Sequence, residues 1–314
     1  KQNLNHLITE LKDLANKHKS TVMIGRTRNQ NAAPTVFGLK VVNWITPLRR
    51  QRERLEELSP RLLVVQFGGS VGTNSALRKR GGDVCDKLAQ ALDLSLPDAP
   101  WHAQRDSIIE FANWLSMTAG QLGKVGKDLM LLSQNEINEI RISNPGKSST
   151  MPNKANPVLF ETLVSLAAFC RNNADLLEQT ALTSHERDGV CMKIERLALP
   201  SLICAASASI VRARDCLKNM SVNIDAIQKN IVADRGLIMA EVALFSLMNF
   251  TTREKATALV SQACESCIIN KSHMIDELKF LSDFDLDWES LKSLKNHLGD
   301  AQQIIEKVVN DHHG

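Results

Sequence analysis

The chain has 314 residues, of which 43% are hydrophobic and 23% charged, a composition typical of a globular protein with a large core. The net charge of +3 and the aromatic content of 4%, with no tyrosine, exclude a nucleic-acid surface of basic blocks and stacking rings. No run of about 18 apolar residues occurs, so we expect neither a transmembrane helix nor a membrane partner.

Cysteine usage favours a reducing compartment. The seven cysteines, an odd number, are scattered through apolar helical patterns, so we expect a cytoplasmic protein without a disulfide framework. Cys264 and Cys267 form a Cys-x-x-Cys pair, but neither a βαβ pattern nor a second ligand pair accompanies it, which favours plain buried thiols. No group of His, Cys, Asp and Glu has metal-ligand spacing, so the sequence predicts no metal.

The first half of the chain carries helical patterns. Apolar residues at helical spacing predict helices over residues 2–18, 34–58, 83–93 and 106–140. Pro34 is expected to open the second of these helices, and Pro47 to kink it. Residues 20–33 lack the helical period and are expected to form a loop or a short hairpin. The chain opens inside its first helix without a capping residue, which predicts that it begins partway through a larger protein.

The second half is predicted to hold two long helices, 157–181 and 190–217, separated by an interruption at residues 183–189. Shorter helices are then expected over residues 223–232, 236–249, 251–269, 274–281, 286–296 and 299–310. Strand signals are nearly absent. We therefore expect an all-α fold with an elongated bundle of long helices (1–219) and a small helical C-terminal domain (220–314). The apolar seams are broader than one partner helix needs, which indicates an oligomer.

The most informative segment is the loop at residues 145–157, Pro-Gly-Lys-Ser-Ser-Thr-Met-Pro-Asn-Lys-Ala-Asn-Pro. It gathers hydroxyl, ammonium and amide groups directly before a predicted helix, whose N-terminus adds a positive dipole and unpaired N–H groups. These groups together could hold a carboxylate. A polar loop whose Ser and Thr side chains merely cap the helix is the alternative that the residues leave open.

Within this loop, Ser148–Pro157 resembles the signature of the fumarase/aspartase superfamily, Gly-Ser-Ser-x-Met-Pro-x-Lys-x-Asn-Pro. Only the leading glycine differs, since Lys147 stands in its place. Gly25–Gln30 followed by Pro34-Thr35 is similar to a second shared region of the superfamily, and Gly68–Thr73 to its glycine-rich turn. The resemblance covers nearly the whole chain and implies that the N-terminal domain of the superfamily, with its substrate-binding Thr-Ser segment, is not part of it.

Four further strips resemble the bacterial 3-carboxy-cis,cis-muconate cycloisomerases within this superfamily: Gly25-Arg26-Thr27, Leu63–Gly69, Trp101–Asp106 and His185-Glu186-Arg187. The resemblance implies a cofactor-free isomerase of protocatechuate (β-ketoadipate) catabolism. Its substrate would be a small polycarboxylate, 3-carboxy-cis,cis-muconate. One carboxylate of this molecule would add to a double bond of the same molecule through an enediolate-like intermediate, and the product would be 4-carboxymuconolactone. It also implies a homotetramer in which each site is built from three subunits.

The resemblance assigns the acid/base role to Ser148, and to Lys154 and Asn156 the stabilisation of the charged intermediate. The residues expected to bind substrate are Thr27, Arg28, Gln30, Ser149, Lys154, Asn156 and Arg187. Glu161 matches the position that pairs with a superfamily histidine, and could pair with Arg28 or simply lie on the surface. For His185 and Arg187, contact with the substrate and a plain surface position are equally compatible with the sequence. His102 is expected to cap or pack near Trp101.

Arg28 stands where the superfamily normally carries a histidine. Arginine does not exchange protons near neutral pH, so its presence argues against ordinary elimination of a nitrogen or oxygen leaving group. It supplies a permanent cation suited to a polycarboxylate instead. Two alternatives remain: an adenylosuccinate-lyase-like elimination enzyme, which would need a purine pocket and a histidine acid, and a catalytically inactive structural homologue. The retained Ser148–Asn156 segment counts against the second.

Overall fold

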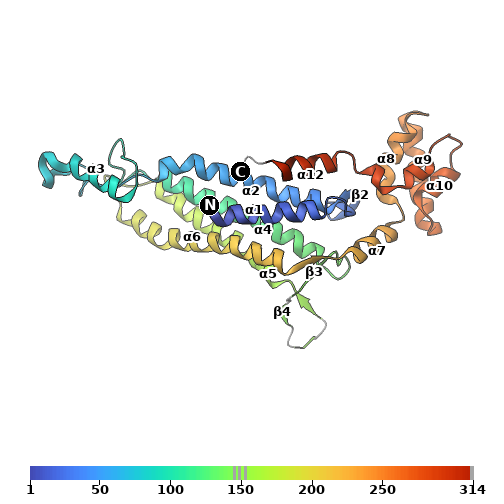
Figure 1. Cartoon of the computed structure of the whole chain (residues 1–314), viewed down its shortest axis with the longest axis horizontal. Helices are drawn as coiled ribbons and strands as arrows, with labels where there is room; N and C mark the ends of the chain where they lie inside the picture. The colour runs from blue at the N-terminus through green and yellow to red at the C-terminus, as the bar shows by residue number, and fades with distance from the viewer. Residues whose placement is uncertain (144–145, 148–149, 152–153, 312–314) are drawn as a thin grey trace. The chain divides into compact units, whose positions relative to one another are not determined.

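The computed structural model describes residues 1–143, 146–147, 150–151 and 154–311. The predicted all-α class is confirmed: helices dominate, and the strands are short and pair only in twos (Figure 1). The chain divides into two compact units. We call residues 1–8, 46–130 and 144–219 the bundle unit, and residues 9–45, 131–143 and 220–314 the hairpin unit. The division after Asn219 coincides with the predicted domain boundary, but the hairpin unit also takes in 9–45 and 131–143.

Long helices make up the bundle unit. Its elements are most of α2 (Phe37–Leu62), η1 (Ser75–Arg80), α3 (Gly81–Leu92), α4 (Asp106–Leu132), β4 (Gly146–Lys147), β5 (Ala155–Asn156), α5 (Val158–Glu178), η2 (Gln179–Ala181) and α6 (Gly189–Lys218). Its core is dominated by small and branched apolar side chains, among them Ala112, Leu115, Ala119, Ala174, Leu177, Ala198 and Leu202. Such small residues allow helices to pack closely.

Two glycines show how closely α4 and α5 approach each other. A Cβ atom added at Gly123 would lie 2.6 Å from Cβ of Ala167, and one added at Gly126 would lie 2.7 Å from the carbonyl oxygen of Phe160. Both distances are shorter than carbon atoms tolerate. The close contact between these helices therefore requires glycine, which has no side chain, at both positions.

The hairpin unit combines two strand pairs with short helices. Its elements are most of α1 (Gln2–Lys17), β1 (Val22–Thr27), β2 (Gln30–Val36), β3 (Ile140–Ile142), β6 (Met220–Val222), α7 (Ile224–Asp234), η3 (Leu237–Met239), α8 (Ala240–Leu247), α9 (Arg253–Asn270), α10 (Met274–Phe280), α11 (Trp288–Lys292), η4 (Leu294–His297) and α12 (Ala301–Asn310). β1 pairs with β2 and β3 with β6, both antiparallel. Phe37 anchors the core, with its ring edge-on to His18 and to Trp44.

The predicted helix boundaries at Pro34 and at residue 140 are wrong. Pro34 does not open a helix: it is buried in β2 opposite Ile24, and α2 begins only at Phe37. Because β2 has a single neighbouring strand, a residue without an N–H can be accommodated there. The predicted helix 106–140 ends at Leu132, since Ile140–Ile142 pairs with β6, a partner about eighty residues away that local periodicity cannot reveal.

Helix α6 is long and apolar. Contrary to the expectation of no such segment, its most apolar 18-residue window is long and apolar enough to cross a membrane, and 28% of that window is buried. The core helix of a soluble protein passes the same test. It packs along α5, and its Leu202 and Ala206 are buried. All seven cysteines are free thiols. Burial raises the pKa of Cys170 to about 11 and that of Cys216 to about 12, so neither is a reactive thiolate near neutral pH.

The glycines of α4 provide a matched test of the bundle packing. Gly123→Ala should lower the free energy of unfolding by about 1–3 kcal/mol, because the added methyl group overlaps Ala167. Gly120→Ala, on the same helix with no atom within 4 Å of the added Cβ, should instead raise it by about 0.5–1 kcal/mol through helix propensity. Urea unfolding of both variants measures the difference, and equal stabilisation by both would contradict the close α4–α5 contact.

Candidate functional site

Three of the predicted substrate-binding residues meet at the tip of the β1–β2 hairpin. Thr27 pairs with Gln30, and the two residues between them, Arg28 and Asn29, have φ angles of 51° and 63°. Positive φ at both central residues is the geometry of a two-residue type I′ hairpin. Thr27, Arg28 and Gln30 are all exposed. Residues 20–33, which were expected to form a loop or a short hairpin, form a hairpin, and its turn presents these three side chains to solvent.

Glycine shapes the hairpin just before the tip. The register shifts between Gly25, which faces Ala33, and Arg26, which faces Asn31, so that β2 holds one extra residue. A Cβ at Gly25 would lie 2.9 Å from the carbonyl oxygen of Ala33. Bulges of this kind redirect the side chains that follow them. The glycine of the predicted Gly-Arg-Thr strip therefore permits a close backbone approach that sets the direction of Arg26.

The signature loop is described only in part. Ser148 and Ser149 lie outside the described residues. Lys154 is exposed, and Asn156 is half-buried in β5 opposite Gly146. The residue before α5 is Pro157, which offers no side-chain cap, while its carbonyl accepts hydrogen bonds from the amides of Phe160 and Glu161. The described part of the loop thus brings a cation and an amide to the start of α5.

A second candidate region lies where α6 begins. Arg187 donates a hydrogen bond of 2.9 Å from Nη2 to the carbonyl oxygen of Gly69, so the predicted glycine-rich turn and the predicted break at 183–189 come together. Gly69 and Gly72 have φ angles of 69° and 90°, which other residues rarely adopt. Beside them is a cavity of about 260 Å³ lined by Gln66, His102, Arg105, Arg187, Met192, Glu195 and Arg196. We call it the arginine cleft.

Asp188 gives the break its shape. Its carboxylate accepts hydrogen bonds from the amides of Val190 and Cys191 as the N-cap of α6, and from the amide of Ser184 across the break. These donors hold the pKa of Asp188 at about 2, below the ordinary value of 3.8. Within the loop so formed, His185 takes a left-handed φ of 52° and stays exposed, while Arg187 reaches Gly69.

The arginine cleft is positively charged. It contains three guanidinium groups and one carboxylate, Glu195, whose Oε1 lies 2.8 Å from Nε of Arg105. This pair is close enough to be ionic, although that N–H does not meet hydrogen-bond geometry. Arg105 also lies over the ring of Trp101 at 5.2 Å and donates to the carbonyl oxygen of His102. With Arg105 held in this way, the other two guanidinium groups are left to attract an anion.

His102 is the residue that sequence reasoning missed. It was expected to cap or pack near Trp101, but it lines the arginine cleft, where its Cε1 is 2.8 Å from a Cβ position at Gly68. Burial lowers the pKa of His102, and the charges of Arg187 and Arg105 lower it further. Its ring is therefore neutral at pH 7. A possible signal was its place in the Trp101–Asp106 strip, but its cleft partners come from distant segments.

One chain does not bring all the predicted residues together. Lys154 and Asn156 precede α5, whereas Arg187 follows it, and a helix of 21 residues is about 32 Å long. Glu161 is exposed on the first turn of α5. Among the described residues, no group of three or more His, Cys, Asp or Glu side chains could hold a metal ion.

The low pKa of His102 can be measured by NMR titration. Its midpoint should lie below 6.5, so that the associated stability is present above pH 6.5 and is lost as the pH falls toward the folded-state pKa. Arg187→Ala should raise the midpoint, because it removes a nearby positive charge. Arg212→Ala, which removes an arginine of α6 that pairs with Asp215, should leave it unchanged. An identical midpoint in Arg187→Ala would contradict the cleft geometry.

Comparison with known proteins identifies relatives of the chain. A sequence model of the lyase family matches residues 1–170. The chain is 35% identical to 3-carboxy-cis,cis-muconate cycloisomerase of Pseudomonas aeruginosa, over 99% of this chain and 70% of that protein. It is also 35% identical to N-acetyl-S-(2-succino)cysteine lyase of Dickeya dadantii, over 96% and 68%. The crystal structure of 3-carboxy-cis,cis-muconate lactonizing enzyme from Pseudomonas putida matches with a TM-score of 0.90 at 32% identity, over 99% and 71%.

The chain spans 68% to 71% of the length of these proteins. The family match covers more than half of the chain, and the relatives are similar over almost all of it. The resemblance carried by Ser148–Pro157, Gly25–Gln30 and Gly68–Thr73 is confirmed, and the chain belongs to the fumarase/aspartase superfamily.

Proposed function

We propose that the protein is a cofactor-free cycloisomerase that converts 3-carboxy-cis,cis-muconate to 4-carboxymuconolactone in the cytoplasm. The observation that carries the proposal is Arg28 at the exposed hairpin tip, in the position of the superfamily histidine. A permanent cation there suits a substrate with several carboxylates and cannot protonate a leaving group. Lactonisation needs no such acid, because no separate molecule departs. The similarity to two enzymes named for this reaction supports the same assignment.

The chemistry follows from the groups assigned to it. A carboxylate oxygen of the substrate forms a bond to the β-carbon of a double bond, and the displaced electron pair moves toward the neighbouring carboxylate. Lys154 and Asn156 stabilise the resulting enediolate-like charge, which is usually the largest contribution to such catalysis. Ser148 then donates a proton to the α-carbon, which completes the addition across the double bond. Thr27, Arg28, Gln30, Ser149 and Arg187 bind the substrate carboxylates.

The length of α5 argues for a site shared between subunits. Lys154 and Arg187 lie at opposite ends of this rigid helix, so one small substrate cannot meet both in a single chain. The helices of the bundle unit also expose large apolar side chains: Val158, Phe169 and Leu176 on α5, and Val190, Leu197, Ile203 and Val211 on α6. Exposed apolar surface on this scale marks an association surface. We therefore infer a homotetramer whose sites combine residues from three subunits.

A second candidate is elimination of a thiol from a carboxylated thioether. The similarity to N-acetyl-S-(2-succino)cysteine lyase supports it. Arg28 is compatible with this reaction, because a thiol with a pKa near 8.5 leaves as a thiolate without the acid that an amine or alcohol requires. Release of free thiol from N-acetyl-S-(2-succino)cysteine, with no turnover of 3-carboxymuconate, would favour this candidate.

The assay for the leading proposal follows the diene absorbance of 3-carboxy-cis,cis-muconate. The protein should remove it, and Ser148→Ala should lower kcat by a factor of about 100 or more, because the proton donor is lost. Ser201→Ala is the matched control, since its hydroxyl donates to the carbonyl oxygen of Leu197 within α6. Persistence of the diene absorbance with the unmodified protein, or normal turnover by Ser148→Ala, would refute the assignment.

Shared sites can be tested by mixing inactive variants. Lys154→Ala and Arg187→Ala tetramers, dissociated and reassembled together, should regain about a quarter of the activity, because about a quarter of the sites then draw an intact Lys154 from one variant and an intact Arg187 from the other. Lys154→Ala mixed with Asn156→Ala is the control. Both substitutions lie on the same loop, so every site carries one of them and no activity should return. Equal recovery in the two mixtures would contradict a site built from several subunits.

A further inference from the structure

The hairpin unit contains a buried ion pair outside the proposed substrate-binding residues. Nη1 and Nη2 of Arg26 donate to Oε2 and Oε1 of Glu139 at 2.9 and 2.8 Å, a fork-to-fork arrangement. The Glu139 side chain is only 1% exposed, and that of Arg26 is 18% exposed. The planar fork of arginine fixes both the distance and the angle between the two side chains. Arg26 is therefore held in one orientation.

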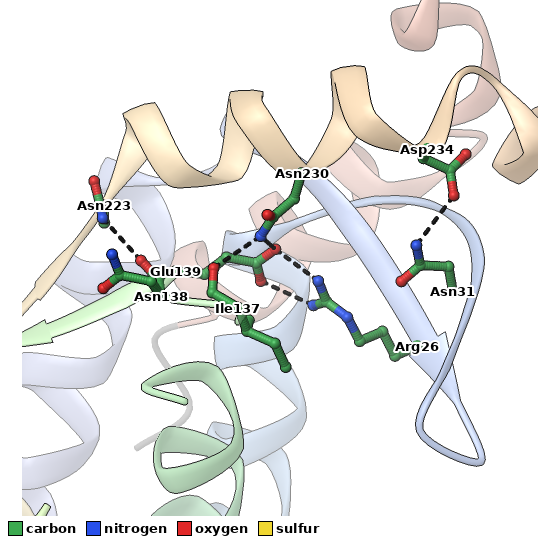
Figure 2. Close-up of polar contacts among 8 residues, drawn as sticks. All are labelled: Arg26, Asn31, Ile137, Asn138, Glu139, Asn223, Asn230 and Asp234. Atoms are coloured by element: carbon green, nitrogen blue, oxygen red, sulfur yellow. Dashed lines mark hydrogen bonds and ion pairs between the residues drawn. The ribbon is translucent and has the colours of Figure 1, made fainter. Parts of the chain in front are cut away.

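Helix α7 holds the other side of Glu139 (Figure 2). Nδ2 of Asn230 donates to Oε1 of Glu139 at 2.9 Å and to the carbonyl oxygen of Ile137 at 2.8 Å. At the start of the same helix, Nδ2 of Asn223 donates to the carbonyl oxygen of Asn138 at 2.8 Å (Figure 2). The backbone N–H of Asn223 donates to the carbonyl oxygen of Glu139. These bonds fix both the main chain and the carboxylate of Glu139.

The second strand of the hairpin is tied to the end of the same helix. Nδ2 of Asn31 donates to Oδ2 of Asp234 at 3.1 Å, and Oδ1 of Asp234 accepts from the amide of Ile238 at 2.8 Å. Arg26 directly precedes Thr27, and Asn31 directly follows Gln30. Both strands are therefore anchored at the residue that borders the tip, and the four tip residues are the part left unanchored by these bonds.

We propose that Glu139 is a positioning residue, which holds the tip Thr27–Gln30 in the conformation that binds a substrate carboxylate. A buried ion pair adds little net stability, because desolvation offsets the attraction, but it fixes geometry where its partners are rigid. Glu139 acts through Arg26 on the hairpin, and it also precedes β3, which leads directly into the signature loop. The proposal rests on the proposed function, in which the tip binds substrate.

The experiment measures binding of tricarballylate, a stable tricarboxylate, by calorimetry in a double-mutant cycle. Glu139→Gln keeps the size of the side chain but replaces one acceptor oxygen with an NH₂ group, and should weaken binding about tenfold through misplacement of the tip. In an Arg28→Ala background the same substitution should weaken binding less than about twofold, because the group it positions is already missing. Glu110→Gln, which breaks the exposed Arg61–Glu110 pair, is the matched control and should bind as the unmodified protein does.

Circular dichroism tests whether each variant folds. If Glu139→Gln does not fold, the same cycle is measured with Asn31→Ala, which removes the anchor of the second strand. Equal weakening in both backgrounds would identify a general structural role and overturn the proposal, as would absence of tricarballylate binding by the unmodified protein. The turnover assay separates the two proposals. If Glu139→Gln weakens binding only when Arg28 is present, but 3-carboxymuconate is not turned over, the proposed reaction is refuted and the positioning role of Glu139 stands. If 3-carboxymuconate is turned over, but Glu139→Gln weakens binding equally in both backgrounds, the reaction stands and the positioning role is refuted.

Discussion

The rigid length of α5 is the constraint on which the proposed site depends. This helix holds Lys154 and Asn156 before its first turn and delivers the chain to Arg187 only after its last, about 32 Å away. No side-chain rearrangement closes such a gap. A substrate of a few ångströms can therefore meet both sets of groups only if different copies of the chain supply them. The apolar residues that α5 and α6 leave exposed are what such copies would cover.

Positive charge recurs in both candidate regions, with different surroundings. Arg28 at the tip and Lys154 at the loop are solvent-exposed cations. In the arginine cleft, Glu195 and the Trp101 ring hold Arg105, while burial and then the positive charges of Arg187 and Arg105 lower the pKa of His102. A neutral histidine beside cations can donate or accept a hydrogen bond without adding a further positive charge. Polycarboxylates suit this pattern better than a substrate with one charge.

Much of this organisation could be predicted from the sequence, for identifiable reasons. Long helices reveal themselves through local periodicity, and the missing period at residues 20–33 indicated a loop or a short hairpin. Contacts between distant segments could not be predicted. Pro34 fits either a helix start or an edge strand, and only the pairing with Ile24 decides. The arginine cleft joins segments around Gly68, His102 and Arg187 that no local pattern connects. The signature loop was identified by its residues, but Ser148 and Ser149 are not among those that the structure describes.

The hairpin tip combines local strain with strong anchoring. Arg28 occupies the left-handed region at φ 51°, which costs a residue other than glycine about 1 kcal/mol or more. Glycine or asparagine would relieve that cost but would remove the cation. A strained turn keeps its conformation only if its surroundings leave no alternative. The Arg26–Glu139 pair on one strand and the Asn31–Asp234 bond on the other supply that restraint. The buried carboxylate of Glu139 is therefore best understood together with the exposed guanidinium of Arg28, two residues beyond Arg26.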